Sequence, residues 1–485
     1  MPRLSSFLAL GAFLSAAHEQ VAAIPTHVDL PRSLPLVRRA SPQLSAMDRL
    51  AAHKAALETK FGVATPAGRK RANGFNLLTN QGADSDYFGS VAVGTPPVAY
   101  NVILDTGSSD FWLASSSVAS SRAASGIPTF EPSASSTFKN LNTPFSITYG
   151  SGGVQGTLGQ DVVQLAGFEV TAQTFAVATA LEQGTISAPL SGLMGLGFQS
   201  ISSSGATPLW QTLASTSGTL DEPLMAFQLT RFHDFRRQSD ADEPGGTFSL
   251  GSTNSSLFTG NIDFQPIPQG QEGYWIQELT GLTVNGNAVT LPSGSDSFGA
   301  IDTGTTLVAG PPDVVSQFYA QIPNSQALTG DQQGFFAFPC DSSVSVSMKF
   351  GASSVSWPVS SSDFIFEQLD GENCVGAFFA LDTSGTTAPP WIIGDTFLKN
   401  VYSVFRASPA AVGFAALSDA ATAQNGKQGP TPVPTVGVQA TVSGAAAPTG
   451  PVRSTGDPSA AHRVEGVLGG RSLLLGALAA AYALC

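Results

Sequence analysis

The chain has 485 residues, of which 42% are hydrophobic and 12% are charged, a balance that excludes disorder over most of its length. Its formal net charge of -13 argues against nucleic acid as a partner, because phosphate recognition needs a basic surface. Three cysteines are too few for a zinc cluster or a disulfide-rich miniprotein, whereas 51 glycines and 31 phenylalanines favour a turn-rich, all-β protein.

Charge is distributed unevenly along the chain. Residues 1–72 carry ten basic and four acidic side chains and have a net charge of +6. Residues 73–418 carry eight basic and 28 acidic side chains and have a net charge of −20. Residues 419–485 carry four basic and three acidic side chains and have a net charge of +1. A basic leader can lie over an acidic body at neutral pH and separate from it when the carboxylates become protonated. The pattern predicts an inactive precursor and a working environment below neutral pH.

The N-terminus carries two processing features. Arg3 precedes an apolar run over residues 4–17 and small residues at 22–23, which predicts a secretory signal peptide over residues 1–23; a buried N-terminal helix is the alternative. Residues 24–71 are basic and end in the dibasic pair Lys70-Arg71, which predicts a pro-segment cleaved after Arg71; an ordinary solvated stretch would also fit. Entry into the secretory pathway permits disulfide bonds.

Most segments of the body from Tyr87 to Phe414 are short apolar runs of Val, Ile, Phe and Thr, broken by Gly, Pro, Ser or Asn. Such runs predict many short β-strands, for example over residues 88–93, 99–104, 145–149 and 344–350. We expect few helices, over residues 209–215 and 312–321.

The body contains an internal repeat. The tripeptide Asp-Thr-Gly begins at Asp105 and again at Asp302, each time at the end of an apolar run. A hydrophobic-hydrophobic-Gly element follows each copy and ends at Gly195 and Gly394, which lie 90 and 92 residues beyond the respective aspartates. Two copies at nearly equal spacing predict a duplicated lobe.

The repeat predicts a chemistry as well. If the two lobes, residues 72–260 and 261–418, pack with their repeats facing each other, Asp105 and Asp302 meet. Two carboxylates in contact cannot both ionise easily, so the pair shares one proton. The ionised member can act as a general base for water and the protonated member as a general acid for a carbonyl oxygen. The alternative is that each aspartate merely caps a turn.

These motifs resemble those of the pepsin family of aspartic proteases, in particular its fungal secreted or surface-anchored members. The resemblance covers about residues 73–418 and implies an all-β, bilobal fold: two similar β-rich lobes with the active-site cleft between them and few short helices. Four stretches carry it: Asp105-Thr-Gly-Ser-Ser with Phe111-Trp112, Asp302-Thr-Gly-Thr-Thr, Ile147-Thr-Tyr-Gly-Ser-Gly, and Trp391-Ile-Ile-Gly-Asp-Thr-Phe-Leu.

The resemblance implies a role for each matching residue. Asp105 and Asp302 would be the catalytic pair, supported by Gly107, Ser108, Gly304 and Thr305. Tyr149 would lie on a β-hairpin flap over the substrate, with its hydroxyl held by Trp112, although both could be core aromatics. Gly150 and Ser151 would bond an extended peptide. Cys340 and Cys374 match the disulfide of the family's C-terminal lobe.

Two further residues of the body stand out. Ser191 stands where many family members have aspartate before the first hydrophobic-hydrophobic-Gly element. Asn254 begins an Asn-Ser-Ser sequon in a polar stretch and predicts N-glycosylation.

The C-terminal region predicts a tether. Residues 419–459 are rich in Pro, Thr and Ala and read as a flexible stalk, and residues 460–485 combine a polar spacer with an apolar tail. This combination matches a glycosylphosphatidylinositol (GPI) attachment signal that is removed, with attachment at Ser459 or alternatively Gly456 or Ser454. A fortuitously apolar C-terminus is the alternative.

Together these features predict an aspartic endopeptidase that is made as a zymogen, works at acidic pH and cleaves extended protein or peptide substrates. A catalytically silent pepsin-like protein that binds peptides or acts as an inhibitor is the alternative, and a surface adhesion protein is a third possibility. We expect no metal, because the body offers only His233 and no Cys/His cluster, and no organic cofactor. We expect a monomer in the secretory pathway and outside the cell, anchored to the cell surface or otherwise secreted, with the lipid anchor as its one link to a membrane.

Overall fold

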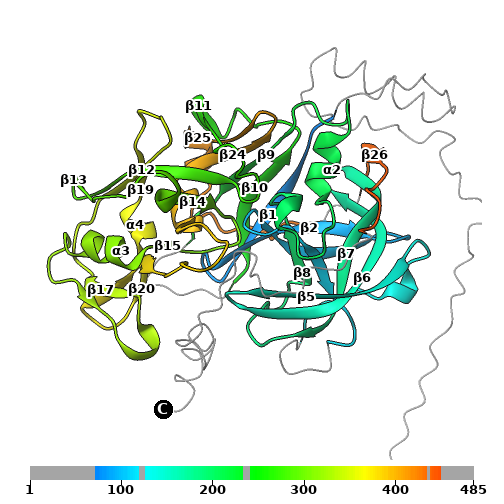
Figure 1. Ribbon diagram of the computed structural model, residues 1–485, viewed down its shortest axis with the longest axis horizontal. Coiled ribbons are helices and arrows are strands. Elements are labelled where there is room, and N and C mark those ends of the chain that lie inside the picture. Colours follow the sequence, from blue (N-terminus) through cyan, green and yellow to red (C-terminus); the bar gives the residue numbers. More distant parts are fainter. Residues whose placement is uncertain (1–71, 119–125, 233–240, 434–436, 449–485) are drawn as a thin grey trace, which may run out of the picture. The chain divides into compact units, whose positions relative to one another are not determined.

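A computed structural model describes residues 72–118, 126–232, 241–433 and 437–448 (Figure 1). The predicted signal peptide, the pro-segment with Lys70 and Arg71, and the attachment signal with Ser459 lie outside the described residues. Within the described ranges, no helix has the length and apolar character needed to cross a membrane.

Strands dominate the regular secondary structure of the described residues, as the composition predicts. The strands up to residue 250 are β1 (Gly74–Gln81), β2 (Asp86–Val93), β3 (Val98–Asp105), β4 (Phe111–Ala114), β5 (Lys139–Tyr149), β6 (Gly152–Leu165), β7 (Phe168–Leu181), β8 (Gly192–Gly195), β9 (Leu224–Leu229) and β10 (Glu243–Leu250). Those that follow are β11 (Phe258–Pro266), β12 (Ile276–Val284), β13 (Asn287–Ala288), β14 (Phe298–Ile301), β15 (Val308–Gly310), β16 (Gln326–Ala327), β17 (Phe336–Pro339), β18 (Val346–Phe350), β19 (Trp357–Val359), β20 (Ile365–Gln368), β21 (Asn373–Gly376), β22 (Phe378–Ala380), β23 (Trp391–Ile393), β24 (Val401–Ala407), β25 (Ala410–Leu417) and β26 (Ala440–Val442).

The helices are short. The α-helices among the described residues are α2 (Leu209–Ser215), α3 (Pro312–Tyr319), α4 (Ser361–Phe364), α5 (Asp395–Leu398) and α6 (Asp419–Thr422), and the 3-10 turns are η2 (Pro132–Ala134), η3 (Gln199–Ile201), η4 (Gly294–Ser297) and η5 (Gly330–Gln332). The helix predicted over residues 209–215 is confirmed, and the one predicted from residue 312 ends two residues early, at Tyr319. Proline begins α3 at its first position, where the missing N–H would have no partner in any case.

Three sheets organise the body. The largest has the strand order β11-β25-β24-β9-β10-β1-β2-β3-β8-β4-β7-β6-β5, with β26 on β7. The second has the order β19-β18-β12-β14-β23-β15-β22, with β13 on β12, and the third has the order β16-β17-β21-β20. The lobe boundary predicted from the sequence, between residues 260 and 261, falls inside β11. This strand belongs to the largest sheet, which contains strands of both predicted lobes.

The repeat read from the sequence has a structural counterpart in each half of the body, that is, in residues 72–260 (the first half) and in residues 261–418 (the second half). β8 lies between β3, to which it is parallel, and β4, to which it is antiparallel. β23 lies in the same way between β14 and β15. Each hydrophobic-hydrophobic-Gly element is therefore the strand that supports the end of a strand leading to an Asp-Thr-Gly loop.

Packed aromatic rings join segments from both halves. The rings of Phe198, Trp210 and Trp275 lie within 5.3 Å of one another, centroid to centroid. Trp275 is fully buried and donates its indole N–H to the carbonyl oxygen of Leu196 at 2.8 Å. This cluster supports the backbone just beyond the first hydrophobic-hydrophobic-Gly element.

A disulfide bond links Cys340, which follows β17, to Cys374 in β21. The two residues are 34 positions apart in the sequence. The bond braces the third sheet, in which β17 and β21 are neighbours.

The C-terminal segment differs from the flexible stalk expected from residue 419. Residues 419–422 form α6, whose buried Ala421 packs on the body, and residues 440–442 form β26, which pairs with β7. The expectation of flexibility is wrong for these parts, because Ser418 caps α6 and Val442 is buried. An alternation of Val438, Ala440 and Val442 within a Pro/Thr/Ala-rich composition is the signal that could have indicated a strand.

Candidate active site

The two Asp-Thr-Gly loops hold their carboxylates in matching ways. The Asp105 carboxylate accepts hydrogen bonds from the Gly107 amide at 2.7 Å and from the Ser108 hydroxyl. The Asp302 carboxylate accepts hydrogen bonds from the Gly304 amide at 2.8 Å and from the Thr305 hydroxyl at 2.7 Å. Each carboxylate is thus oriented by one backbone donor and one hydroxyl donor of its own loop.

The two loops face each other closely. A Cβ atom built on Gly107 would lie 2.4 Å from the carboxyl carbon of Asp302, and one built on Gly304 would lie 2.5 Å from the carboxyl carbon of Asp105. A Cβ atom does not approach a non-bonded atom that closely, so the absence of a side chain at each glycine leaves space for the carboxylate of the opposite loop. The structure therefore brings Asp105 and Asp302 together, and both are almost completely buried.

The threonines between these residues were not singled out from the sequence. The Thr106 amide donates to the Thr303 hydroxyl at 3.1 Å, and the Thr303 amide donates to the Thr106 hydroxyl at 2.9 Å. Each hydroxyl also donates across to the opposite strand, from Thr106 to the Ile301 carbonyl oxygen at 2.8 Å and from Thr303 to that of Leu104 at 2.6 Å. These reciprocal bonds fix the register of one loop on the other.

Burial and the neighbouring carboxylate change the acidity of the site. Burial raises the pKa of Asp105 well above its ordinary value, and repulsion from Asp302 adds to the increase. The hydrogen bonds from Ser108 and Gly107 act in the opposite direction, because they stabilise the charged form. The protonated form of Asp105 therefore persists to higher pH than that of an isolated aspartate.

A β-hairpin carries Tyr149 beside the pair. A tight turn at the exposed residues Gly150 and Ser151 joins the end of β5 to the start of β6, and Tyr149 pairs with Gly152 across the hairpin. Tyr149 itself is buried, and its hydroxyl accepts a hydrogen bond from the indole N–H of Trp112 at 3.0 Å. Burial raises the pKa of Tyr149 well above its ordinary value, and the charges of Asp110 and Asp105 add to this.

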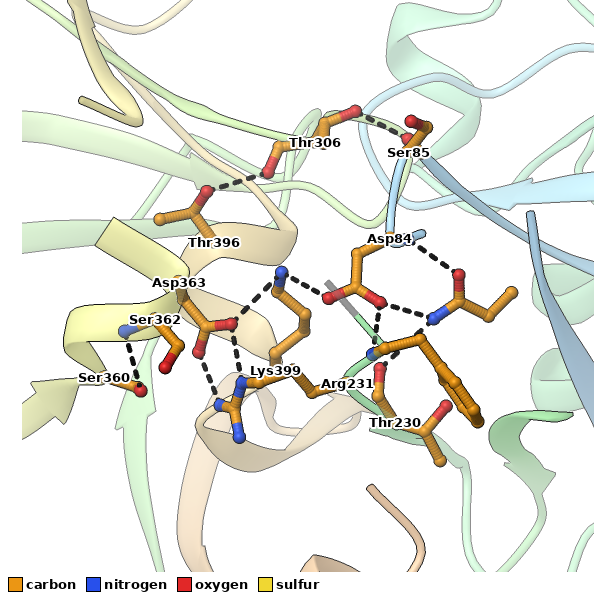
Figure 2. Close-up of polar contacts among 12 residues, drawn as sticks. Asp84, Ser85, Thr230, Arg231, Thr306, Ser360, Ser362, Asp363, Thr396 and Lys399 are labelled. Atoms are coloured by element: carbon orange, nitrogen blue, oxygen red, sulfur yellow. Dashed lines mark hydrogen bonds and ion pairs between the residues drawn. The ribbon is translucent and has the colours of Figure 1, made fainter. Parts of the chain in front are cut away.

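Behind the second loop lies a buried ion network that the sequence did not reveal (Figure 2). Lys399 Nζ lies 2.9 Å from Asp84 Oδ2 and 3.2 Å from Asp363 Oδ1, and Arg231 pairs with Asp363 through two nitrogens. Burial alone would raise the pKa of Asp84, but the charge of Lys399 and hydrogen bonds outweigh it and lower that pKa. Burial alone would lower the pKa of Lys399, but the charges of Asp363 and Asp84 and their hydrogen bonds outweigh burial and raise that pKa.

The network connects to the site through Thr306. The Thr306 hydroxyl donates to the Ser85 carbonyl oxygen at 2.7 Å, next to Asp84, and its own carbonyl oxygen accepts from the Thr396 hydroxyl at 3.0 Å (Figure 2). Thr396 lies on α5, and Lys399 directly follows that helix. The ion network therefore holds α5 and the second Asp-Thr-Gly loop against the β1–β2 turn.

Two more carboxyl groups near the pair favour their protonated forms. Burial raises the pKa of Asp86 from 3.8 to about 6. Burial also raises the pKa of Asp395 well above its ordinary value, against the charge of Lys399 and together with that of Asp302. One oxygen of Asp395 is buried without a hydrogen-bond partner among the described residues. Asp86 and Asp395, like Asp105, therefore lose their protons at a higher pH than an isolated aspartate does.

The remaining predicted residues, Asn254 and Ser191, take no part in the hydrogen bonds that orient the two carboxylates. Asn254 is exposed in the loop before β11. Ser191 is fully buried directly before β8, where its amide donates to the Asn101 carbonyl oxygen and its carbonyl oxygen accepts from the Ala114 amide. Its hydroxyl oxygen has no partner among the described residues, and the bonds that orient Asp105 do not involve it.

Comparison with known proteins gives the family. The family model "Eukaryotic aspartyl protease" matches residues 86–417. The chain is 43% identical over 358 residues to "Major aspartyl peptidase 1" of Cryptococcus neoformans var. grubii, covering 72% of each chain. It is 34% identical to "Pepsin A" of Sus scrofa, covering 68% of this chain and 81% of that one, and 34% identical to "Aspartic protease" of Phaffia rhodozyma, covering 78% and 88%. The chain therefore belongs to the eukaryotic aspartyl proteases and is an aspartic endopeptidase that hydrolyses peptide bonds.

Proposed function

We propose that Asp105 and Asp302 together hydrolyse peptide bonds at acidic pH while holding one proton between them. The observation that carries this assignment is the mutual fit of the loops, in which Gly107 and Gly304 each leave space for the opposite carboxylate. The raised pKa of Asp105 supports it, because the reaction requires the pair to retain a proton. Gly107, Ser108, Gly304 and Thr305 support the pair by orienting its oxygens.

The proton movements follow from this state. The ionised carboxylate removes a proton from a water molecule, whose oxygen attacks the carbonyl carbon, while the protonated carboxyl gives its proton to the carbonyl oxygen. The resulting gem-diol collapses when the amide nitrogen gains a proton, the C–N bond breaks, and a carboxylic acid and an amine leave. Two carboxyl groups suffice to balance every proton in this sequence.

The flap hairpin binds substrate in this proposal. Gly150 and Ser151 are exposed at the turn, where their polar groups can bond an extended peptide. The hydrogen bond from Trp112 and the burial of Tyr149 keep the hairpin positioned beside the pair. Substrates are therefore proteins or peptides in extended conformation.

Cleavage of a protein substrate by the purified, acid-treated chain tests this function. We expect activity in acid, and we expect a peptide mimic with a hydroxyl in place of the scissile carbonyl to inhibit it, because that group resembles the gem-diol. A folded chain that binds the mimic without cleaving any protein substrate would instead favour a catalytically silent role.

We propose that the chain is a zymogen activated by removal of residues 24–71. Support comes from the basic charge of that segment and from Ala72, whose amide donates to the Thr219 carbonyl oxygen at 3.0 Å and whose carbonyl oxygen accepts from Asp221 at 2.9 Å. The body is therefore bonded from its first residue onward. N-terminal sequencing before and after acidification tests this: the active form should begin at Ala72, and activity with residues 24–71 intact would contradict the proposal.

We propose that Asn254 carries an N-linked glycan. It is exposed, and its side-chain oxygen accepts hydrogen bonds from the Ser256 amide at 3.1 Å and from the Ser256 hydroxyl at 2.7 Å. Support therefore comes from an accessible asparagine already bonded to the hydroxyl of its sequon. An endoglycosidase should shift the mass of the secreted protein and leave Asn254→Gln unchanged; equal masses before and after treatment would contradict the proposal.

We propose that the secreted protein is anchored outside the cell by a lipid attached at Ser459. The composition of residues 460–485 supports this. A phospholipase that cleaves the anchor should release the protein from membrane or wall fractions, and Leu474→Arg should send it into the medium. Mass spectrometry that finds intact Leu484-Cys485 in the mature protein would end this proposal and leave the protease activity untouched.

A further inference from the structure

The chain beyond the catalytic body follows a defined path. The family match ends at residue 417, yet the chain remains bonded to the body after it. The Gly426 amide donates to the Arg231 carbonyl oxygen at 2.8 Å, and the Arg231 amide donates to the Asn425 side chain at 2.9 Å. These bonds lead the chain from β25 to the end of β9.

The next described stretch binds to β7. Residues 440–442 pair in parallel with Phe168, Glu169 and Val170, and the Gln439 amide donates to the Gly167 carbonyl oxygen at 2.6 Å. The Thr441 hydroxyl donates to the Glu169 carboxylate at 3.2 Å. The pairing covers the part of β7 before Ala176, the residue where its pairing with β4 begins.

Side chains fix the register of this pairing. Val442 is 2% exposed and belongs to the main hydrophobic core, and Ala440 packs against that core. Val438 lies on the same strand face in the alternation but is 44% exposed. A Cβ atom on Gly444 would lie 2.0 Å from the carbonyl oxygen of Ala172, so a larger residue would push the segment away from β7.

The segment ends beside a loop of the first half. A Cβ atom built on Gly205 would lie 3.6 Å from the Cβ of Pro448. The described chain therefore ends near residue 205, which precedes α2 in the sequence, and Figure 1 shows β26 beside α2 and well apart from β25.

We propose that residues 437–448 form a strap that closes the edge of β7 and fixes the point from which the tail leaves the body. The strap is a strand supplied by the chain itself: Val442 anchors it in the core, and Gly444 allows it to approach Ala172. The point where the strap ends, beside residue 205, is then the point from which any group carried by the tail is tethered. The proposal does not depend on the catalytic assignment.

Engineered disulfide formation tests the exit point directly. A Cβ–Cβ distance of 3.6 Å lies within the range that a disulfide spans. Gly205→Cys with Pro448→Cys should therefore cross-link in an oxidising buffer, in a full-length Cys485→Ser background, as read by mass spectrometry of unreduced peptides. Gly218→Cys with Pro448→Cys is the matched control, because Gly218 has a similar positive φ but no atom within 4 Å of its built Cβ. Failure at residue 205, or equal cross-linking at both, would overturn the proposal.

Hydrogen exchange tests the strap in the unmodified chain. Amides of residues 440–444 should exchange at least about tenfold more slowly than those of an unstructured peptide. Val442→Asp and Gly444→Val should remove this protection and increase exchange at residues 168–170, whereas Val438→Asp should change neither. Unprotected amides at residues 440–444 of the wild-type chain would overturn the proposal even if the variants fail to fold.

Discussion

Lys399 and Asp84 form a buried ion pair, with Nζ and Oδ2 2.9 Å apart, although 315 positions separate them in the sequence. Asp363 also pairs with Lys399, and Arg231 pairs with Asp363, so every charge of the network lies beside a charge of opposite sign. The network stabilises the contact between α5 and the β1–β2 turn, behind the second Asp-Thr-Gly loop.

Removing the central cation should destabilise the body strongly. Lys399→Met leaves two buried carboxylates without their shared partner, which we expect to lower the free energy of unfolding by about 3–5 kcal/mol. Chemical denaturation monitored by tryptophan fluorescence measures this. Lys139→Met, at an exposed lysine of β5, is the control and should change stability by less than about 0.5 kcal/mol. Equal stability of the two variants would show that the network contributes nothing.

The reciprocal threonines should affect catalysis through the geometry of the pair. Thr303→Val removes the hydroxyl that bonds both the Thr106 amide and the Leu104 carbonyl oxygen. A displacement of about 1 Å at a catalytic group can reduce the rate by about 10²-fold, and we expect a loss of that order in kcat with little change in KM. Thr303→Ser keeps the hydroxyl and should restore most of kcat. If Val and Ser variants behave alike, the hydroxyl does not position the pair.

Stability should fall as the pH rises through the range in which Asp86 ionises. Its pKa is raised from 3.8 to about 6 by burial, so the folded protein binds this proton more tightly than the unfolded chain does. The associated stabilisation is fully present below about pH 3.8 and is lost as the pH approaches and passes 6, amounting to about 3 kcal/mol at most. Asp105 and Asp395, whose pKa values are also raised, act in the same direction.

Thermal unfolding at a series of pH values measures this effect. Asp86→Asn should flatten the decline between pH 4 and 6 relative to the wild type, because the amide cannot ionise. Asp331→Asn, at an exposed residue of η5, should leave the decline unchanged. A wild-type stability that rises steadily from pH 4 to 7 would contradict the assigned direction.

The disulfide should stabilise the third sheet independently of catalysis. In the chain-entropy view, closing a loop of 34 residues contributes about 3–4 kcal/mol. Cys340→Ser with Cys374→Ser should therefore lower the unfolding temperature while kcat at low temperature stays close to that of the wild type. A proportional loss of kcat at temperatures where the double variant is fully folded would argue that the bond also positions the active site.

The sequence predicts those features that local pattern determines. The Asp-Thr-Gly repeat, the strands leading into it and α2 all follow from short-range spacing, and the structure contains them. Family resemblance adds the pairing of Cys340 with Cys374, which the structure contains as well. These features need no knowledge of how distant segments pack.

Other features depend on packing between distant segments, which a single sequence does not encode in any short pattern. Thr106 and Thr303 look like ordinary loop residues until the two loops meet, and Lys399 resembles a surface lysine at the end of a short helix. The strap resembles a linker in composition, and the short alternation of Val438, Ala440 and Val442 is too weak a signal to predict a strand without the burial of Val442 that the structure shows.

Turnover by Asp105→Asn and Asp302→Asn tests the central claim most directly. Asparagine is nearly isosteric with aspartate but cannot share the proton, so both variants should fold, as judged by circular dichroism, and each should lose at least about 10³-fold in kcat/KM. Asp382→Asn, at an exposed aspartate, serves as the control and should retain wild-type activity. Loss of activity in both active-site variants with the fold intact is the predicted result, and a folded Asp105→Asn or Asp302→Asn variant with near-wild-type turnover would contradict the mechanism.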